Sequence, residues 1–197
     1  MRVGLPKGRL LPVSERVLGQ LRLNRDSSGS YRIVSTDITV WLLKMCDIPK
    51  LVASGGLDVG LAPTEWVEES GAGCERLADA DGYPVRVSIL GTPEWRDRLD
   101  ETRRLRVATE YPNLARRHLA HRAARLTVVE VHGSAEAYPP ELADVVVDSV
   151  ETGKTAERHG LVEVERLFDC GIHVIARPRA GGEERRVGAT IGGIVAG

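Results

Sequence analysis

The residues best suited to bind phosphate lie at positions 152–155, where Thr-Gly-Lys-Thr follows an apolar run at residues 145–147. Gly153, Lys154 and Thr155 match the end of a nucleotide-binding P-loop, G-x-x-x-x-G-K-[ST]. Counting back from Gly153 to the place of the first glycine reaches Asp148 instead. By its pattern, the segment is therefore not a P-loop.

The same segment can still hold an anion. A buried strand, an acidic residue at its end and a turn of small residues before a helix present backbone N–H groups to a phosphate. Asp148 and Glu151 would repel a bare phosphate, but carboxylates accept hydrogen bonds from sugar hydroxyls, so the combination points to a ribose 5-phosphate. The simpler interpretation is structural: Thr152 and Thr155 cap a helix, and Asp148 ends a strand. These residues alone do not decide between the two.

Four further candidates also follow predicted strands or begin helices. Lys7 and Arg9 lie in a turn directly after residues 2–6, where their charges suit a phosphate, although from the local pattern alone a solvated turn is the better explanation. Glu136 either orients a ligand or caps the next helix. Tyr111 precedes a proline that starts a helix, and its ring either lines a site or packs.

Short β-branched runs position these candidates, and they alternate with helical patterns. Strands are predicted at residues 2–6, 57–62, 85–90, 105–110, 126–131, 143–150 and 173–178, and helices at residues 10–21, 93–99 and 114–124. This rhythm predicts an α/β fold with mainly parallel sheets and ligands at the carboxyl ends of strands. The glycines of residues 179–197 argue against a stable helix there.

Breaks in this pattern predict two lobes. Gly82 and Pro84 interrupt it first, and near Val162 the chain could return to the first lobe. We therefore expect residues 1–84 with 163–197 to form lobe I, and residues 85–162 to form lobe II with the 5-phosphate loop.

Composition excludes several classes of function. The 197 residues are 42% hydrophobic, enough for a sizeable core, and a net charge of -1 argues against nucleic acid as a partner. No apolar run approaches the ~18 residues of a membrane span, and no secretory segment is seen, so we expect a cytoplasmic protein without membrane contact. Cys46, Cys74 and Cys170 are far apart and odd in number, which favours free thiols in a reducing compartment.

Four collinear stretches carry a family resemblance. They are GLPKGRLLP at residues 4–12, MCDIPKLVASGGLDVGLAPTEWVEE at 45–69, VATEYPNLARRHLA at 107–120, and HGSAEAYPPELADVVVDSVETGKTAERHGLVEVERLFD at 132–169. Together they resemble the ATP phosphoribosyltransferases that open histidine biosynthesis. The resemblance implies two α/β lobes arranged like a type II periplasmic binding protein, with substrates in the cleft between them. The chain is similar to the short form, which has no C-terminal regulatory domain.

The resemblance also implies roles. Thr152, Gly153, Lys154 and Thr155 would cradle the 5-phosphate of phosphoribosyl pyrophosphate, and Asp148 and Glu151 would contact the ribose or its metal. Lys7 and Arg9 would face the pyrophosphate or the phosphates of ATP, while Mg²⁺ would be bound through the pyrophosphate without an assigned protein ligand. It further implies a regulatory subunit and a homo-oligomer.

The sequence departs from the family on the acceptor side. Where the family has a lysine and a Gly-Lys-Asp, this chain has Glu110 and Pro63-Thr64-Glu65, so cations are replaced by carboxylates. Tyr111, Glu136, Glu65 and Glu110 are accordingly the acceptor-side candidates. ATP is the expected acceptor. Two alternatives remain: a divergent member that uses a smaller, less anionic heterocycle, and a catalytically silent binding or regulatory protein.

Overall fold

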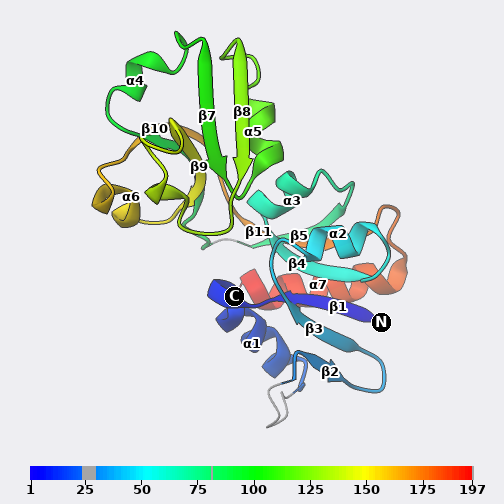
Figure 1. Cartoon of the computed structure of the whole chain (residues 1–197). Helices are drawn as coiled ribbons and strands as arrows, with labels where there is room; N and C mark the ends of the chain where they lie inside the picture. The colour runs from blue at the N-terminus through cyan, green and yellow to red at the C-terminus, as the bar shows by residue number, and fades with distance from the viewer. Residues whose placement is uncertain (24–29, 81, 197) are drawn as a thin grey trace. The chain divides into compact units, whose positions relative to one another are not determined.

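The computed structural model describes residues 1–23, 30–80 and 82–196. The chain divides into two compact units, Met1–Tyr83 with Gly171–Gly197, and Pro84–Cys170. Each unit has its own β-sheet covered by helices (Figure 1). Cys46, Cys74 and Cys170 are free cysteines. No helix in the described ranges is long and apolar enough to cross a membrane.

Unit 1 contains a six-stranded sheet in the order β2-β3-β1-β4-β11-β5. Strand β1 pairs in parallel with β3 and β4, whereas β2, β11 and β5 join in antiparallel orientation. Every residue of β4 and of β11 is buried, as expected for strands covered on both faces. The strands are β1 (Arg2–Pro6), β2 (Arg32–Val34), β3 (Thr39–Leu43), β4 (Val59–Pro63), β5 (Glu75–Ala80) and β11 (Ile172–Ala176).

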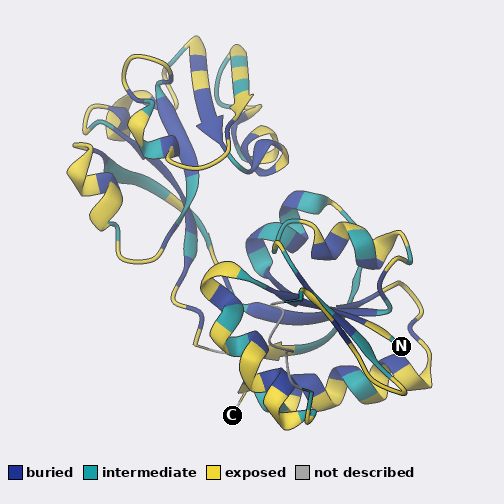
Figure 2. Cartoon of the chain, turned by 60° about the horizontal axis from the view of Figure 1, so that its bottom comes forward, coloured by how far each residue is buried: buried dark blue, intermediate teal, exposed yellow. Residues whose placement is uncertain are grey.

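Helices cover both faces of this sheet, and along these helices buried residues alternate with exposed ones (Figure 2). Helix α1 (Leu11–Gln20) packs beside α7 (Gly182–Ala196), and α2 (Ile48–Ala53) packs beside α3 (Thr64–Ser70). A short 3-10 helix, η1 (Gly8–Leu10), joins β1 to α1. The buried hydroxyl of Ser14 donates to the carbonyl of Pro6 at 2.6 Å, which fixes α1 against the end of β1.

Unit 2 contains a five-stranded sheet in the order β10-β6-β9-β7-β8. Strands β9, β7 and β8 are mutually parallel, and β6 and β10 are antiparallel to their neighbours. The strands are β6 (Arg86–Gly91), β7 (Arg104–Thr109), β8 (Arg125–Glu130), β9 (Val145–Val150) and β10 (Val162–Asp169). The helices are α4 (Trp95–Arg98), α5 (Pro112–Leu119), η2 (Ala135–Ala137) and α6 (Lys154–Arg158).

The structure confirms the α/β class but not the mainly parallel sheets, because both sheets are mixed. Apart from the antiparallel β2–β3 pair, the cause lies in the two connections between the units. Strand β5 leaves unit 1 as β11 enters it, and β6 enters unit 2 as β10 leaves it, so each pair of strands runs in opposite directions. Alternation of strands and helices in the sequence does not reveal these reversals.

The division of the chain also differs from the expected one at its second boundary. The expected return to lobe I at residue 163 would place β10 in that lobe, but the structure returns at Gly171. Strand β10 belongs to unit 2 because it pairs along its length with β6. The first boundary lies after Tyr83, one residue before the expected position.

The expectation of no stable helix at residues 179–197 is wrong, because α7 spans Gly182–Ala196. Its glycines are a packing device. A Cβ atom on Gly188 would lie 2.5 Å from Leu77 Cδ1, and one on Gly192 would lie 2.5 Å from Ala78 Cβ. The low helix propensity of glycine is thus outweighed by close packing of α7 on β5.

Candidate functional site

The predicted 5-phosphate loop follows β9 in unit 2. Three valines, Val145–Val147, are fully buried, and β-branched residues of this kind favour a central strand. Asp148 is half-buried near the end of the strand, where its carboxylate accepts the Ser149 N–H at 2.7 Å. The structure thus places Asp148 at the carboxyl end of a parallel strand, next to the turn that contains the other predicted loop residues.

Gly153 sets the shape of this turn. Its φ of 78° lies in the left-handed region that favours glycine, and it immediately precedes α6. Thr152, Lys154 and Thr155 are exposed around it, as is Glu151. The Lys154 N–H points to the Thr152 hydroxyl at 3.5 Å, a long contact that leaves this N–H accessible to a stronger acceptor.

A hollow of about 220 Å³ lies beside the loop. Thr152 and Gly153 line it together with Arg86, whose guanidinium donates to the Glu163 carboxylate at 2.7 Å and to the Glu151 carbonyl at 3.2 Å. The hydrogen bond to Glu163 raises the pKa of Arg86, with burial opposing and the charge of Glu163 adding to it. Arg86 could not be assigned to the loop from the sequence, because its place beside the loop depends on the antiparallel register that pairs it with Val150.

Tyr111 packs inside unit 2. Its side chain is 1% exposed. Its N–H donates at 2.8 Å to the hydroxyl of Thr109, which itself donates to the Val147 carbonyl at 2.6 Å. The packing alternative for Tyr111 therefore describes its place in the structure. Glu110 and Glu136, the other acceptor-side candidates of this unit, are half-buried.

Lys7 and Arg9 lie in unit 1, where β1 ends. The Lys7 N–H is held by the Leu43 carbonyl at 2.8 Å, and the ammonium lies 4.6 Å from the centre of the Tyr31 ring. The Arg9 guanidinium lies 5.9 Å from the centre of the Tyr83 ring, and its side chain is 36% exposed. Aromatic rings therefore support both cations while leaving part of each accessible.

Glu65 is the buried member of the same group. Its side chain is fully buried, accepts the Tyr83 hydroxyl at 2.8 Å and lies 3.8 Å from an Arg9 nitrogen. A fully buried carboxylate cannot contact an acceptor substrate directly. Glu65 therefore lies on the interior side of the partly exposed Arg9. Tyr83 could not be assigned to this group from the sequence either, because it lies far from both partners in the chain.

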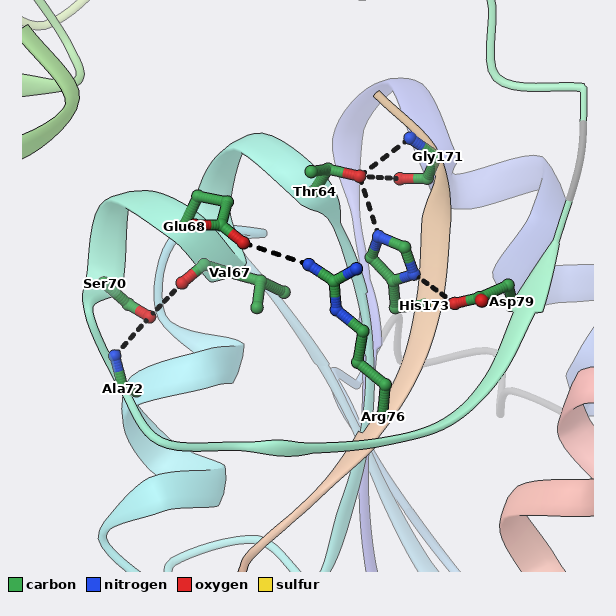
Figure 3. A network of polar contacts seen from close by, with 9 residues as sticks. All are labelled: Thr64, Val67, Glu68, Ser70, Ala72, Arg76, Asp79, Gly171 and His173. Carbon is green, nitrogen blue, oxygen red and sulfur yellow. Dashed lines mark hydrogen bonds and ion pairs between the residues drawn. The ribbon is translucent and has the colours of Figure 1, made fainter. Parts of the chain in front are cut away.

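The residue before Glu65 anchors helix α3. The Thr64 hydroxyl accepts the Gly171 N–H at 2.8 Å, contacts the Gly171 carbonyl at 3.2 Å and lies 2.7 Å from His173 Nε2 (Figure 3). His173 Nδ1 lies 2.5 Å from the Asp79 carboxylate. The first two residues of α3 therefore hold both ends of the connections to unit 2: Thr64 contacts Gly171, and Glu65 contacts Tyr83.

The predicted residues thus form two groups, each within one unit. Asp148, Glu151 and residues 152–155 belong to one segment of unit 2, and Lys7 belongs to unit 1 with Arg9 and Glu65, whose charged groups lie 3.8 Å apart. Among the described residues, no cluster of three or more histidine, cysteine, aspartate or glutamate side chains could hold a metal ion. Asp148 and Glu151 contribute carboxylates to the loop segment, and carboxylates are ligands that Mg²⁺ takes when it is already bound to substrate phosphates.

Comparison with known proteins identifies the family. The family model described as ATP phosphoribosyltransferase matches residues 44–194. The ATP phosphoribosyltransferase of Acidovorax sp. (strain JS42) is 30% identical over 188 residues, which cover 90% of this chain and 87% of that protein.

Solved structures agree on the fold. The ATP phosphoribosyl transferase (HisG:HisZ) complex from Thermotoga maritima contains a chain with a TM-score of 0.86 and 22% identity, covering 99% of this chain and 98% of that one. The periplasmic aliphatic sulphonate binding protein SsuA from Escherichia coli gives a TM-score of 0.59 at 16% identity, covering 98% of this chain and 65% of that one. The fold is therefore like that of periplasmic binding proteins, and by its sequence the chain belongs to the ATP phosphoribosyltransferase family.

Proposed function

We propose that this protein is an ATP phosphoribosyltransferase, which transfers the 5-phosphoribosyl group from phosphoribosyl pyrophosphate to a ring nitrogen of ATP and releases pyrophosphate. This is the first step of histidine biosynthesis. The observation that carries the proposal is the Asp148 to Thr155 segment, an acidic strand end followed by an exposed Thr-Gly-Lys-Thr turn, in a chain that belongs to this family.

In the proposed reaction the bond from C1 of the ribose to pyrophosphate breaks as the ring nitrogen attacks C1. The transition state resembles an oxocarbenium ion, so the protein needs no nucleophilic side chain and acts by positioning and by stabilising charge. The backbone of the turn and the hydroxyls of Thr152 and Thr155 bind the 5-phosphate. Asp148 and Glu151 accept hydrogen bonds from the ribose hydroxyls, and Lys7 and Arg9 bind the departing pyrophosphate or the phosphates of ATP.

Mg²⁺ belongs to this proposal as a companion of the substrate. When bound to the pyrophosphate it would neutralise part of the charge that develops on the leaving group. Asp148 and Glu151 are the residues of the loop that could contact it. Their number fits an ion that is held mainly by substrate oxygens and water.

The proposal also includes the protein's partners and location. The T. maritima neighbour is part of a two-component complex, which supports a separate partner subunit here, and a homo-oligomer is the expected assembly of the catalytic chain. The three free thiols are compatible with the cytoplasm.

The decisive experiment is release of pyrophosphate by the purified protein with Mg²⁺, phosphoribosyl pyrophosphate and ATP. We expect release to require all three, with and without added partner subunit as separate arms. If ATP fails with the partner present while another heterocycle supports release, the acceptor is wrong. If the protein does not bind phosphoribosyl pyrophosphate at all in calorimetry, the catalytic assignment is wrong.

A further inference from the structure

A second hollow, of about 450 Å³, opens in unit 2 at the starts of β7 and β8. Its lining contains four arginines and a single carboxylate, in a chain whose net charge is only -1. The lining residues are Trp95, Arg98, Thr102, Arg104, Leu105, Arg106, Arg125, Thr127 and Asp144. The lining therefore carries more positive than negative charge, although the chain as a whole is close to neutral.

Two of the arginines occupy paired positions on the neighbouring strands β7 and β8. Arg104 of β7 is paired in register with Arg125 of β8, and both side chains are exposed, while Leu105 between the arginines of β7 is buried. Like charges at directly opposite positions destabilise a sheet. An anion bound between them would turn this repulsion into attraction.

One pair of charges in the hollow, Arg106 and Asp144, is already engaged. Arg106 donates to the Asp144 carboxylate at 2.8 Å and to the Pro140 and Glu141 carbonyls, so the carboxylate of the lining is used within the lining. Arg98 lies 5.1 Å from the centre of the Trp95 ring. In the described part of the chain, no carboxylate lies within 4.0 Å of the charged nitrogens of Arg104 or Arg125.

This hollow is separate from the proposed donor site. Strands β7, β8 and β9 are parallel, so residues that begin β7 and β8 lie at the opposite edge of the sheet from the loop that follows β9 (Figure 1). At about 3.3 Å per residue, a six-residue strand separates the two edges by roughly 17 Å. One ligand of phosphate size cannot touch both places.

We propose that the hollow at Arg98, Arg104 and Arg125 is a second anion site, which binds a small phosphate-bearing anion with at least two negative charges. Guanidinium groups bind phosphate oxygens through paired charge-assisted hydrogen bonds, and the Thr127 side chain adds a neighbouring hydroxyl. The volume accommodates either free pyrophosphate or the diphosphate of a nucleotide.

The test is titration of the ¹⁵N-labelled full chain with pyrophosphate, and in a second arm with ADP, followed by backbone amide shifts. We expect saturable shifts at residues 102–106 and 125–127 with at least one probe. Shifts at residues 151–155 report the proposed donor site separately, so failure of either site is seen independently of the other. Sodium chloride at matched ionic strength controls for screening.

Arg104→Ser and Arg125→Ser should each weaken binding of the anion, measured at residues 102–106 and 125–127, about tenfold or more, because each removes a charge-assisted contact. Arg103→Ser is the matched control, since Arg103 is exposed on the same segment but does not line the hollow. Equal weakening in all three variants would overturn the proposal in favour of general charge attraction. So would the absence of saturable shifts at this edge with both probes.

Discussion

Glu65 is fully buried beside Tyr83, whereas Arg9 is partly exposed. Glu65 can therefore orient Arg9, and the Arg9 guanidinium is accessible to a ligand. Glu65→Gln keeps the shape and leaves an oxygen for the Tyr83 hydroxyl, but removes the negative charge opposite Arg9. We expect kcat/KM to fall by roughly tenfold, mainly through KM for the anionic substrate that Arg9 is proposed to bind.

Steady-state kinetics with each substrate varied in turn would measure this effect. Glu68→Gln is the matched control, because Glu68 lies on the same helix and pairs with Arg76 at 3.0 Å on the surface. An equal loss in the control, or an unchanged KM in Glu65→Gln, would contradict a role for Glu65 in orienting Arg9.

In the turn after β9, the backbone conformation of Gly153 is constrained, whereas the side chain of the neighbouring Lys154 is exposed. Gly153 has a φ of 78° and a Cβ atom there would meet nothing closer than Val150 Cγ1 at 3.9 Å, so the constraint is backbone conformation rather than space. Gly153→Val should weaken binding of phosphoribosyl pyrophosphate by tenfold or more, since the left-handed conformation costs a side chain on the order of 1–2 kcal/mol and valine more.

Lys154→Ala is the comparison, because the Lys154 side chain is exposed and the proposed cradle consists of backbone and hydroxyl groups. We expect a loss of less than about threefold, the size of a solvent-exposed ionic contact. Calorimetry with Mg²⁺ and the donor measures both variants, and a larger loss for Lys154→Ala than for Gly153→Val would show that the lysine is the main ligand.

At the scale of the element, the start of α3 depends on the Thr64 hydroxyl, which contacts the Gly171 N–H, the Gly171 carbonyl and His173 (Figure 3). Thr64→Val preserves the shape but leaves the partners of the hydroxyl without it. We expect about 1–3 kcal/mol lower free energy of unfolding. Thr190→Val is the control, because its hydroxyl makes one exposed contact to the Arg186 carbonyl.

Denaturant unfolding followed by tryptophan fluorescence would measure both changes. A loss within about 0.5 kcal/mol for Thr64→Val, the range of ordinary surface substitutions, would show that the helix start is held by other contacts.

Seven strands were predictable from their β-branched runs, because burial in a sheet selects those residues wherever the chain runs. Four strands, β2, β3, β5 and β10, escaped prediction. Strands β5 and β10 did so because charged residues are spread through them and neither has a buried apolar run, and β2 is only three residues long. The apolar run of β3 was overlooked, although its residues favour a strand. The helix α7 escaped for the opposite reason: its glycines lower local propensity, and their use against β5 depends on a contact with a distant segment.

At the scale of the whole molecule, the loop at residues 148–155 could be found in the sequence because its chemistry is contiguous. Arg86 and Tyr83 could not be found in this way. Arg86 reaches the loop through the pairing of β6 with β9, and Tyr83 reaches Glu65 from the residue at which the chain leaves unit 1. The burial of Glu65 was likewise invisible, because one acidic residue on a short helix looks the same exposed or buried.

Ion pairs within each unit make the free energy of unfolding depend on pH. Glu163 has its pKa lowered by the hydrogen bond from Arg86, with burial opposing and the charges of Arg86 and Arg166 adding to it. Burial raises the pKa of Asp58, but the hydrogen bonds and charge of Arg2 lower it further than burial raises it. Both carboxylates bind protons more weakly when folded than when unfolded, so the stabilisation they give is present near neutral pH.

For Glu163 the ordinary pKa is 4.5, so its contribution is complete above that value and is lost as the pH falls through the lower pKa of the folded state. Glu163→Gln should therefore lower the free energy of unfolding at pH 7 by up to about 1 kcal/mol, the usual limit for a partly exposed pair. The difference from the wild type should shrink as the pH falls below 4.5 through the lower pKa of the folded state, because the Glu163 carboxylate then loses its charge. Glu157→Gln, which removes an exposed carboxylate from the same hollow, is the matched control. Denaturant unfolding from pH 7 to pH 3 measures all three proteins, and a Glu163→Gln deficit that stays constant over this range would show that shape, rather than charge, links β10 to β6.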